Sequence, residues 1–240
     1  MKRLYLPATI LILSSLLACE TPPKNDEVSP IIEEMRAELA PDKRVALWDL
    51  SFENDSLKGE TDQLTGLDEL ISELKSKNIS FTDAVKRLPE EGLGDLTKAI
   101  VTISVANIRS QPKHSAELGT QALMGTPLNV LKEEDGWFLV QTPDGYLSWV
   151  DRAGIQLMTS EEQEQWLSHP KLVFNKLYGH VWKSADQKDM VSDLVAGDIL
   201  TFEGENNGYA EVRLPDGRLG YIPSEETMMW EDWISSRSTA

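Results

Sequence analysis

The chain repeats itself at a fixed offset, and this repeat constrains its fold more than any other feature. Gly125 and Gly197 lie 72 residues apart (197 minus 125). The same offset, without a gap, pairs glycine–aromatic steps, tight turns and strand ends: Gly136-Trp137 with Gly208-Tyr209, Pro143-Asp144-Gly145 with Pro215-Asp216-Gly217, and Trp149-Val150 with Tyr221-Ile222. A fixed period of this kind indicates that one supersecondary unit occurs twice.

Each copy has the pattern of short strands joined by tight turns. The glycine of each Pro-Asp-Gly turn can adopt a positive φ, which tight hairpin turns require. Hydrophobic and polar residues alternate after the turns, as they do along half-buried strands. Short strands packed into about sixty residues predict a small closed or half-closed β-barrel. We therefore expect one barrel over residues 99–157 and a second over 171–223.

A small α+β unit is expected before the first barrel, over residues 31–98. Helical spacing predicts a helix over 31–39, with Ser29 as its N-cap, and an amphipathic helix over 65–77. Strands are expected at 45–50, 57–60 and 81–88. The order strand, strand, helix, strand resembles the BON-type modules of envelope proteins.

A helix is also expected after each barrel. Residues 158–170 are predicted to form a linker containing a short acidic helix over 160–166, with Ser160 as its N-cap. Residues 224–240 are predicted to be a helical C-terminal segment that carries Trp230 and Trp233. The predicted fold class is therefore mainly β, with an α+β unit at the N-terminus.

The first residues are typical of an export signal. Lys2 and Arg3 precede an apolar run over 4–17, which is shorter than the roughly 20 residues needed to span a bilayer. Leu16-Leu17-Ala18-Cys19 then resembles a bacterial lipobox. The resemblance implies that residues 1–18 are a lipoprotein signal peptide, that Cys19 carries lipid, and that 19–30 is a tether.

The strong negative charge excludes two classes of partner. The formal net charge is −17, and removal of Lys2 and Arg3 makes it −19. Nucleic-acid binding needs basic surface that neutralises phosphates, so nucleic acid is not expected as a partner. The same charge argues against broad docking on anionic lipid headgroups.

The first barrel segment resembles a bacterial SH3 (SH3b) domain. The residues that carry the resemblance are Asn107-Ile108-Arg109, Gly136-Trp137 and Trp149-Val150. The second copy has His180-Val181-Trp182 in place of the opening motif, and the first copy has Ser148 where the family keeps a glycine. The resemblance implies two SH3-like small β-barrels in tandem, joined by a short helix.

The order of segments also resembles a known class of enzyme. Lipobox, α+β unit, SH3b, acidic helix, SH3b and tryptophan-bearing helix occur in the N-terminal, non-catalytic half of Bacteroidetes NlpC/P60 γ-D-glutamyl-diamino acid endopeptidases. In that family a domain with a Cys-His-His arrangement follows the position of Ala240. The resemblance implies that the partner is the peptidoglycan stem peptide, L-Ala-γ-D-Glu-diamino acid, and that a catalytic NlpC/P60 domain could be a second partner.

No catalytic residues are predicted within this chain. Cys19 is the only cysteine and is expected to carry lipid, so thiol catalysis lacks its nucleophile. His114, His169 and His180 are scattered and predicted to be exposed without a second ligand nearby, so no metal is expected. No cofactor is expected, because no glycine-rich phosphate loop precedes a helix. As it stands the chain is not predicted to be an enzyme, unless it is a truncated NlpC/P60 endopeptidase or has an unrecognised carboxylate pair.

The resemblance assigns ligand binding to the first SH3b segment. Glu117 and Tyr146 are the best positional matches for the acidic residue and the tyrosine that recognise the free amino end of the stem peptide. A carboxylate offers an ammonium charge-assisted hydrogen bonds, and a tyrosine offers a flat wall. Trp137, Trp149 and Arg109 complete the candidate site. The alternative is that the aromatic residues build the barrel and that the charged residues are solvated.

The sequence therefore favours a membrane-anchored envelope lipoprotein that binds stem peptides for an NlpC/P60 system. The alternative is a structural or adaptor lipoprotein whose SH3b pair binds another envelope protein. Glu20 follows the lipid site where aspartate is associated with inner-membrane retention. The periplasmic face of the outer membrane is therefore preferred to the inner membrane or the cell surface.

Overall fold

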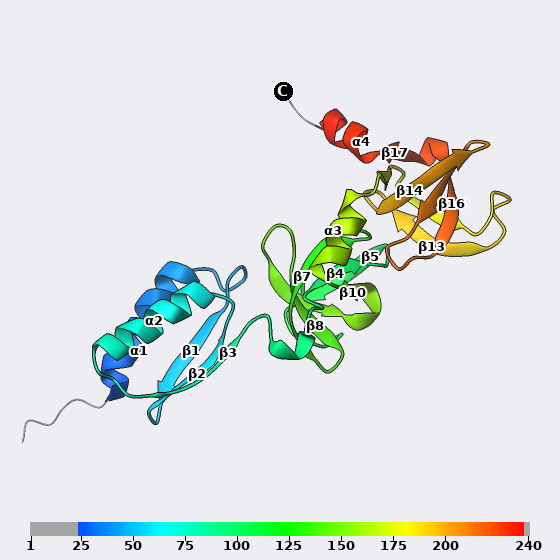
Figure 1. The fold of residues 1–240 in the computed structure, drawn as a ribbon. Coiled ribbons are helices and arrows are strands. Elements are labelled where there is room, and N and C mark those ends of the chain that lie inside the picture. Colours follow the sequence, from blue (N-terminus) through cyan, green and yellow to red (C-terminus); the bar gives the residue numbers. More distant parts are fainter. Residues whose placement is uncertain (1–23, 238–240) are drawn as a thin grey trace, which may run out of the picture.

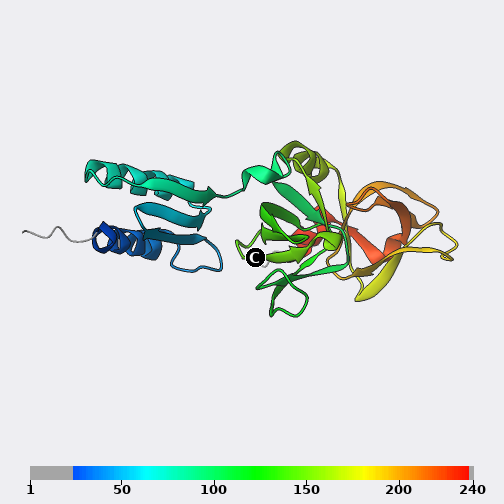
Figure 2. The same ribbon diagram turned by 90° about the horizontal axis from the view of Figure 1, so that it is seen from below.

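A computed structural model describes residues 24–237, which form three bodies in a row (Figures 1 and 2). An α+β unit comes first, and two seven-stranded sheets follow. The predicted lipid site, Cys19, lies outside the described residues, as do residues 1–18. The described part is mainly β, as expected.

The α+β unit is a three-stranded sheet with two helices on one side (Figure 1). Its elements are α1 (Lys24–Leu39), β1 (Trp48–Glu53), β2 (Ser56–Thr61), α2 (Leu64–Ser76) and β3 (Thr82–Arg87). β1 and β2 are antiparallel, whereas β2 and β3 are parallel and joined through α2. The helix predicted over 65–77 and the strand predicted over 81–88 are confirmed as α2 and β3. The helix buries Leu67, Leu70 and Leu74 on one face, whereas Val85 is the one buried residue of β3.

The start of the first helix differs from the prediction. We expected Ser29 to cap a helix over 31–39 and 19–30 to be a tether, but α1 begins at Lys24 and runs through Pro30. Val28 is fully buried against the sheet and Ile32 is nearly so. Asp26 and Glu27 stand in the first turn, where the helix dipole favours carboxylates. Burial of Val28 therefore outweighs the backbone hydrogen bond that Pro30 cannot donate.

The first large sheet holds seven strands in the order β10-β4-β7-β8-β9-β5-β6. Its elements are η1 (Glu91–Leu93), β4 (Lys98–Val101), β5 (Val105–Arg109), β6 (Leu118–Leu123), β7 (Pro127–Glu134), β8 (Trp137–Gln141), β9 (Leu147–Asp151), η2 (Arg152–Gly154), β10 (Ile155–Met158) and α3 (Ser160–Ser168). The sheet curls around a core that includes Ile108, Val130 and Phe138.

The second large sheet repeats the first strand for strand. Its elements are β11 (Lys171–Phe174), β12 (Tyr178–Trp182), β13 (Met190–Val195), β14 (Ile199–Asn206), β15 (Tyr209–Arg213), β16 (Leu219–Pro223), η3 (Ser224–Glu226), β17 (Thr227–Met229) and α4 (Trp230–Arg237). Read from β17, the order is β17-β11-β14-β15-β16-β12-β13, in which each strand is the counterpart of one in the first sheet. The repeat seen in the sequence is therefore confirmed. Both sheets are open in this order, so the predicted closure into barrels stays a prediction.

Three local expectations need correction. Alternating hydrophobic and polar residues over 99–107 predict a single strand, but this run forms two strands, β4 and β5, because the chain turns between them and Thr102 N donates to Gly154 O. The acidic helix α3 is capped by Thr159, whose hydroxyl accepts from Glu162 N, and not by Ser160. The segment after Ser224 is not one helix, because residues 227–229 form β17 and pair with β11.

The α+β unit packs on the outer face of the first sheet. Leu47 and Leu88 join a buried cluster with Leu139 and Trp149. Leu147 N donates to Arg44 O at 2.6 Å. The loop before β1 and the segment after β3 are therefore both fixed to the sheet.

The two large sheets meet through a buried methionine. Met124, between β6 and β7, is fully buried in the core of the second sheet. Its backbone N–H donates to Asp198 Oδ1 at 3.2 Å, and its carbonyl accepts from Ile199 N at 3.0 Å. The three bodies are thus joined by packed contacts as well as by the chain.

Candidate ligand-binding cleft

A cleft of about 310 Å³ opens beside β5, β8 and β9 of the first sheet. Its polar lining consists of Asn107, Arg109, His114 and Asp151, and Trp137 forms one wall. The loop between β5 and β6 supplies His114, and the start of η2 closes the opposite side. Apolar side chains, among them Val105 and Val150, form the floor. This mixture of an apolar floor and a few polar groups is typical of ligand sites.

A histidine and a carboxylate meet in this cleft. Asp151 Oδ1 accepts from Ala153 N at 2.8 Å and so caps η2. Asp151 Oδ2 lies 3.3 Å from His114 Nε2. The register of β8 and β9 places Trp137 opposite Asp151, and the His114 ring packs edge-on against Trp137 with centroids 5.0 Å apart. The His114 side chain is 80% exposed, so the imidazole contacts Trp137 and Asp151 at the open side of the cleft.

Arg109 provides the positive group of the cleft. Its Nη1 donates to the carbonyl of Ala116 at 2.8 Å, which ties the guanidinium to the end of the loop that carries His114. The remaining donors suit a carboxylate, because a guanidinium forms planar, bidentate pairs with that group. Asp151 in turn suits an ammonium. The cleft can therefore hold the two charged ends of a small zwitterionic ligand.

The structure brings two of the predicted site residues together and separates the others. Arg109 and Trp137 line the cleft. Trp149 is paired with Arg109 across β5 and β9, but it is buried beneath the α+β unit. Glu117 is exposed at the end of the loop, and its carboxylate makes no ion pair among residues 24–237. Tyr146 does not line the cleft either.

Tyr146 lies instead at the contact with the α+β unit. It is 36% exposed, and the Arg44 guanidinium carbon lies 5.8 Å from its ring centroid. Hydrogen bonds from the Arg44 side chain and backbone lower the pKa of Asp42 to about 2, so Arg44 keeps a charged partner. A ligand that stacks on Tyr146 would therefore compete with an arginine that is already in place.

Sequence reasoning missed the pair formed by His114 and Asp151. The prediction that His114 has no candidate ligand group nearby is wrong, because the folded loop carries it to Asp151. Asp151 directly follows the Trp149-Val150 motif, which is a usable signal for its position. His114 has no such signal, because its place depends on the course of an irregular loop.

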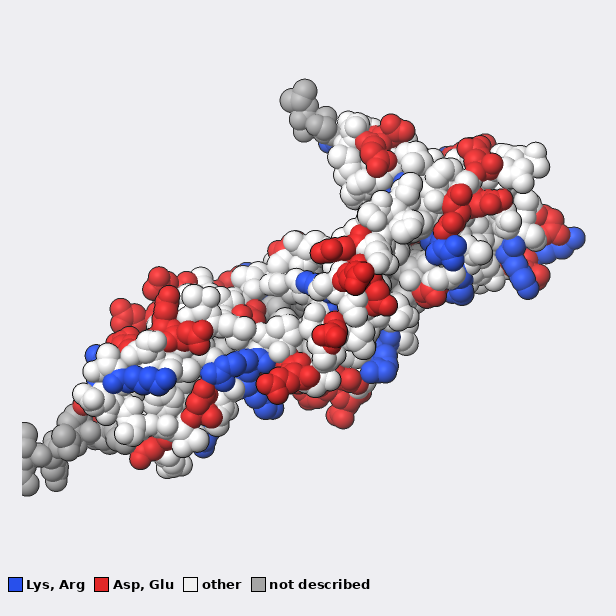
Figure 3. Space-filling view, viewed as in Figure 1, with Lys and Arg blue, Asp and Glu red and all other residues white. Residues whose placement is uncertain are grey.

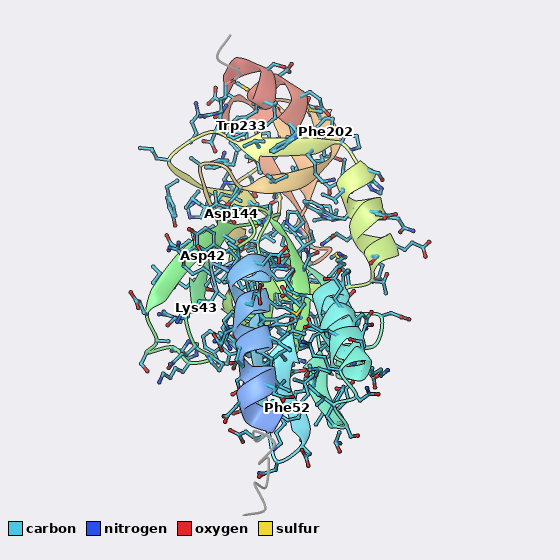
Figure 4. All side chains as sticks on the ribbon, turned by 90° about the vertical axis from the view of Figure 1, so that its left-hand side faces the viewer. Asp42, Lys43, Phe52, Asp144, Phe202 and Trp233 are labelled. Atoms are coloured by element: carbon cyan, nitrogen blue, oxygen red, sulfur yellow. The ribbon has the colours of Figure 1, made fainter. Side chains whose placement is uncertain are left out.

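A larger, mostly apolar hollow of about 790 Å³ lies where the two sheets meet α3 and α4. Lys171 lines it, and burial lowers the pKa of this lysine to about 8. The Lys171 ammonium donates to the carbonyls of Trp166 and His169, so it closes the last turn of α3. Trp230 lines this hollow and stacks on Trp233, which is also on α4. Trp233 lies at the opposite end of the view from Phe52 (Figure 4).

The described residues hold no group of three or more histidine, cysteine or acidic side chains that could bind a metal. Within the same range, no helix is both long and apolar enough to cross a membrane. On the face shown in Figure 3, acidic and basic side chains are interspersed, without a continuous basic area.

Comparison with known families identifies the first sheet. Residues 108–155, from β5 to the start of β10, match the family described as a bacterial dipeptidyl-peptidase SH3 domain. This part of the chain is therefore similar to a bacterial SH3 domain, and it includes Arg109, His114, Trp137 and Asp151 of the cleft.

Two named proteins are similar to about half of the chain. Dipeptidyl-peptidase 6 of Lysinibacillus sphaericus is 27% identical over 133 residues, which are 53% of this chain and 49% of that protein. YrvJ of Bacillus subtilis strain 168, named for an N-acetylmuramoyl-L-alanine amidase activity, is 27% identical over 140 residues, which are 55% of this chain and 26% of that protein. The chain thus matches half or less of the length of these relatives.

Solved structures give two further matches. An NlpC/P60 family protein from Bacillus cereus ATCC 10987 is 19% identical, with a TM-score of 0.45 over 55% of this chain and 56% of that one. An NlpC/P60 endopeptidase from Photobacterium damselae subsp. piscicida is 16% identical, with a TM-score of 0.44 over 87% of this chain and 46% of that one.

Proposed function

We propose that this chain, which carries a bacterial SH3 domain of the dipeptidyl-peptidase type, is a recognition protein of the bacterial cell wall. Its relatives include proteins named as a dipeptidyl-peptidase and an amidase, each similar to about half of the chain. We infer that the two sheets are SH3-like modules in tandem and that they bind peptidoglycan without cutting it.

The cleft of the first sheet is the proposed ligand site. The observation that carries this proposal is the joint presence of Arg109 and Asp151 around one apolar floor of suitable size. A stem peptide has a free amine, carboxylates and small apolar side chains. Its amine would bind Asp151 and its carboxylate would bind Arg109. The exposed Glu117, on the loop that carries His114, would attract the amine from solution.

The remaining parts of the proposal concern location. Lipid on Cys19 would anchor the chain in the envelope, on the periplasmic face of the outer membrane. The described residues would then project the SH3 domain toward the cell wall. In this arrangement the chain acts as the substrate-recognition part of an NlpC/P60 system, and the catalytic domain is supplied in addition to it.

Calorimetry with the tripeptide L-Ala-γ-D-Glu-diamino acid tests the ligand site. We expect Asp151→Asn to weaken binding about tenfold or more, because a charge-assisted hydrogen bond contributes roughly 1.5–3 kcal/mol. Glu117→Gln should weaken binding less, since Glu117 is exposed. Asp135→Asn, in the exposed turn between β7 and β8, is the matched control and should change nothing. Equal binding by all four proteins, or none by the unaltered one, would refute the proposal.

An adaptor role is the second candidate. It is favoured by the outer face of the first sheet, which already holds a folded unit through Leu88, Leu139 and Trp149. The packing of this face on another unit of the same chain supports a role in binding protein. Crosslinking of the lipid-anchored chain in cells distinguishes the two roles, because an adaptor would be captured with one protein and a wall-binding protein with peptidoglycan fragments.

A further inference from the structure

The outer faces of the two sheets correspond to each other residue by residue. In the first sheet, one row of paired residues crosses β7, β8, β9 and β5, and consists of Lys132, Leu139, Trp149 and Arg109. In the second sheet, the corresponding row crosses β14, β15, β16 and β12, and consists of Gly204, Glu211, Tyr221 and Trp182. A β-bulge precedes the first residue of both rows, so the two rows are in the same register.

In the first sheet the ammonium group of Lys132 occupies a site beside this row. Lys132 Nζ lies 5.3 Å from the centroid of the Trp149 ring. It also lies 2.6 and 2.8 Å from the two carboxylate oxygens of Glu60, which comes from the α+β unit. Only 16% of the Lys132 side chain is exposed. An ammonium thus fits between an aromatic face and a carboxylate at this position of the fold.

In the second sheet glycine replaces the lysine, and Tyr221 provides the aromatic face. The carboxylate does not come from another unit here, because Glu211 takes the place of Leu139 in the row itself. A Cβ placed on Gly204 would meet only Glu211 Oε2, at 3.9 Å. The site that Lys132 fills in one copy is therefore open in the other and lies beside a carboxylate. Tyr221 and Glu211 are both partly exposed, and they lie opposite each other on β16 and β15.

No cation of the described part neutralises Glu211. The basic residues nearby in the sequence are engaged elsewhere. Arg213 Nε lies 2.7 Å from Glu203 Oε1, and Arg218 Nη2 lies 2.7 Å from Asp216 Oδ2. Glu211 itself forms no ion pair within residues 24–237. Its charge is therefore available to a cation from outside.

The aromatic surface extends beyond Tyr221. Trp182 lies opposite Tyr221 on β12, and its ring centroid is 5.0 Å from that of His180. His180 in turn lies 5.0 Å from Tyr178, which is 62% exposed. A row of rings beside an unpaired carboxylate suits a cation carried on an aliphatic stem, because the stem packs on the rings and the charge meets the carboxylate.

We propose that Gly204, Glu211, Tyr221 and Trp182 form a receptor for the primary alkylammonium group of a peptide. The incoming ammonium takes the position that Lys132 occupies in the first sheet. Glu211 accepts its hydrogen bonds, and the faces of Tyr221 and Trp182 hold its methylene groups. The strongly acidic chain raises the local concentration of such cations.

Calorimetry with the peptide acetyl-Gly-Lys-Gly-amide tests this receptor, with its ε-N-acetylated form as the ligand control. We expect binding of the lysine peptide and none of the acetylated peptide, because acetylation removes the charge. Glu211→Gln should weaken binding about tenfold. Gly204→Lys should abolish binding, because its own ammonium fills the site, while Ser236→Lys adds the same charge on the exposed face of α4 and should leave binding unchanged.

Thermal melting first establishes that each variant is folded. If Gly204→Lys does not fold, binding by Glu211→Gln still tests the receptor. The receptor is overturned if the lysine peptide does not bind, if the acetylated peptide binds equally well, or if Glu211→Gln binds as the unaltered protein does. Asp151→Asn should leave this binding intact. Its effect on the tripeptide therefore reports on the first sheet alone, and either site can fail without the other.

Discussion

Asp198 lies at the junction of the two sheets with none of its surface exposed. Burial raises the pKa of its carboxyl group to about 7, although backbone N–H groups of Val195 and Met124 donate to it and act in the opposite direction. The folded protein therefore holds a proton that the unfolded chain releases near pH 4. Stability contributed by this group is present at low pH and is lost as pH rises from about 4 to 7.

Replacement of Asp198 isolates this effect. Asp198→Asn keeps one acceptor oxygen and cannot ionise, so its stability should not show the loss between pH 4 and 7. Thermal melting of both proteins at pH 4, 5.5 and 7 measures the difference. The gap between their melting temperatures should shift in favour of the variant as pH rises. A gap that is constant with pH would contradict the assignment.

The positions of individual site residues could be predicted from the sequence to different extents. Arg109 and Trp137 belong to the motifs that mark the SH3 domain, so their place in one cleft could be anticipated. The contact between His114 and Asp151 could not, because it depends on the path of a loop without regular hydrogen bonding. Trp149 shows a third case, since its aromatic character is evident in sequence while its covering by Leu88 depends on how two units dock.

Whole elements were predicted best where one hydrophobic period extends over many residues. α2, with Leu67, Leu70 and Leu74 buried on one face, lies where the pattern placed it. The start of α1 was missed because Pro30 favours a helix that begins at that residue, whereas the burial of Val28 extends the helix back to Lys24. β17 was missed because three residues are too few to show a period, and only their pairing with β11 makes them a strand.

The loop between β6 and β7 is the element that couples the two sheets. Met124→Ala should destabilise the second sheet by about 2–5 kcal/mol, because it removes a side chain that is fully buried in that core. Urea unfolding measures the change. Met190→Ala, at a position that is 59% exposed, should have little effect. Equal losses for the two variants would mean that Met124 is not part of the core.

Across the whole molecule, docking of the α+β unit depends on a small apolar cluster and one enclosed ion pair. Leu88 is 2% exposed within that cluster. Leu88→Asp should release the unit from the first sheet, because a buried, unpaired carboxylate costs several kcal/mol. Small-angle scattering should then report a larger radius of gyration. Leu96→Asp, which alters a residue that is 41% exposed, should leave the radius unchanged. No difference between the variants would contradict the docked arrangement.

The burial of Met124 in the core of the second sheet links the two proposed binding sites. Because the first sheet inserts this side chain into the core of the second, the distance between the cleft and the ammonium receptor is fixed. A polymer that repeats its charged groups at that distance would bind both sites at once and gain avidity, whereas a short fragment would bind only one site. Chain length and crosslink density of the ligand, rather than any single contact, would then set how tightly the protein is retained.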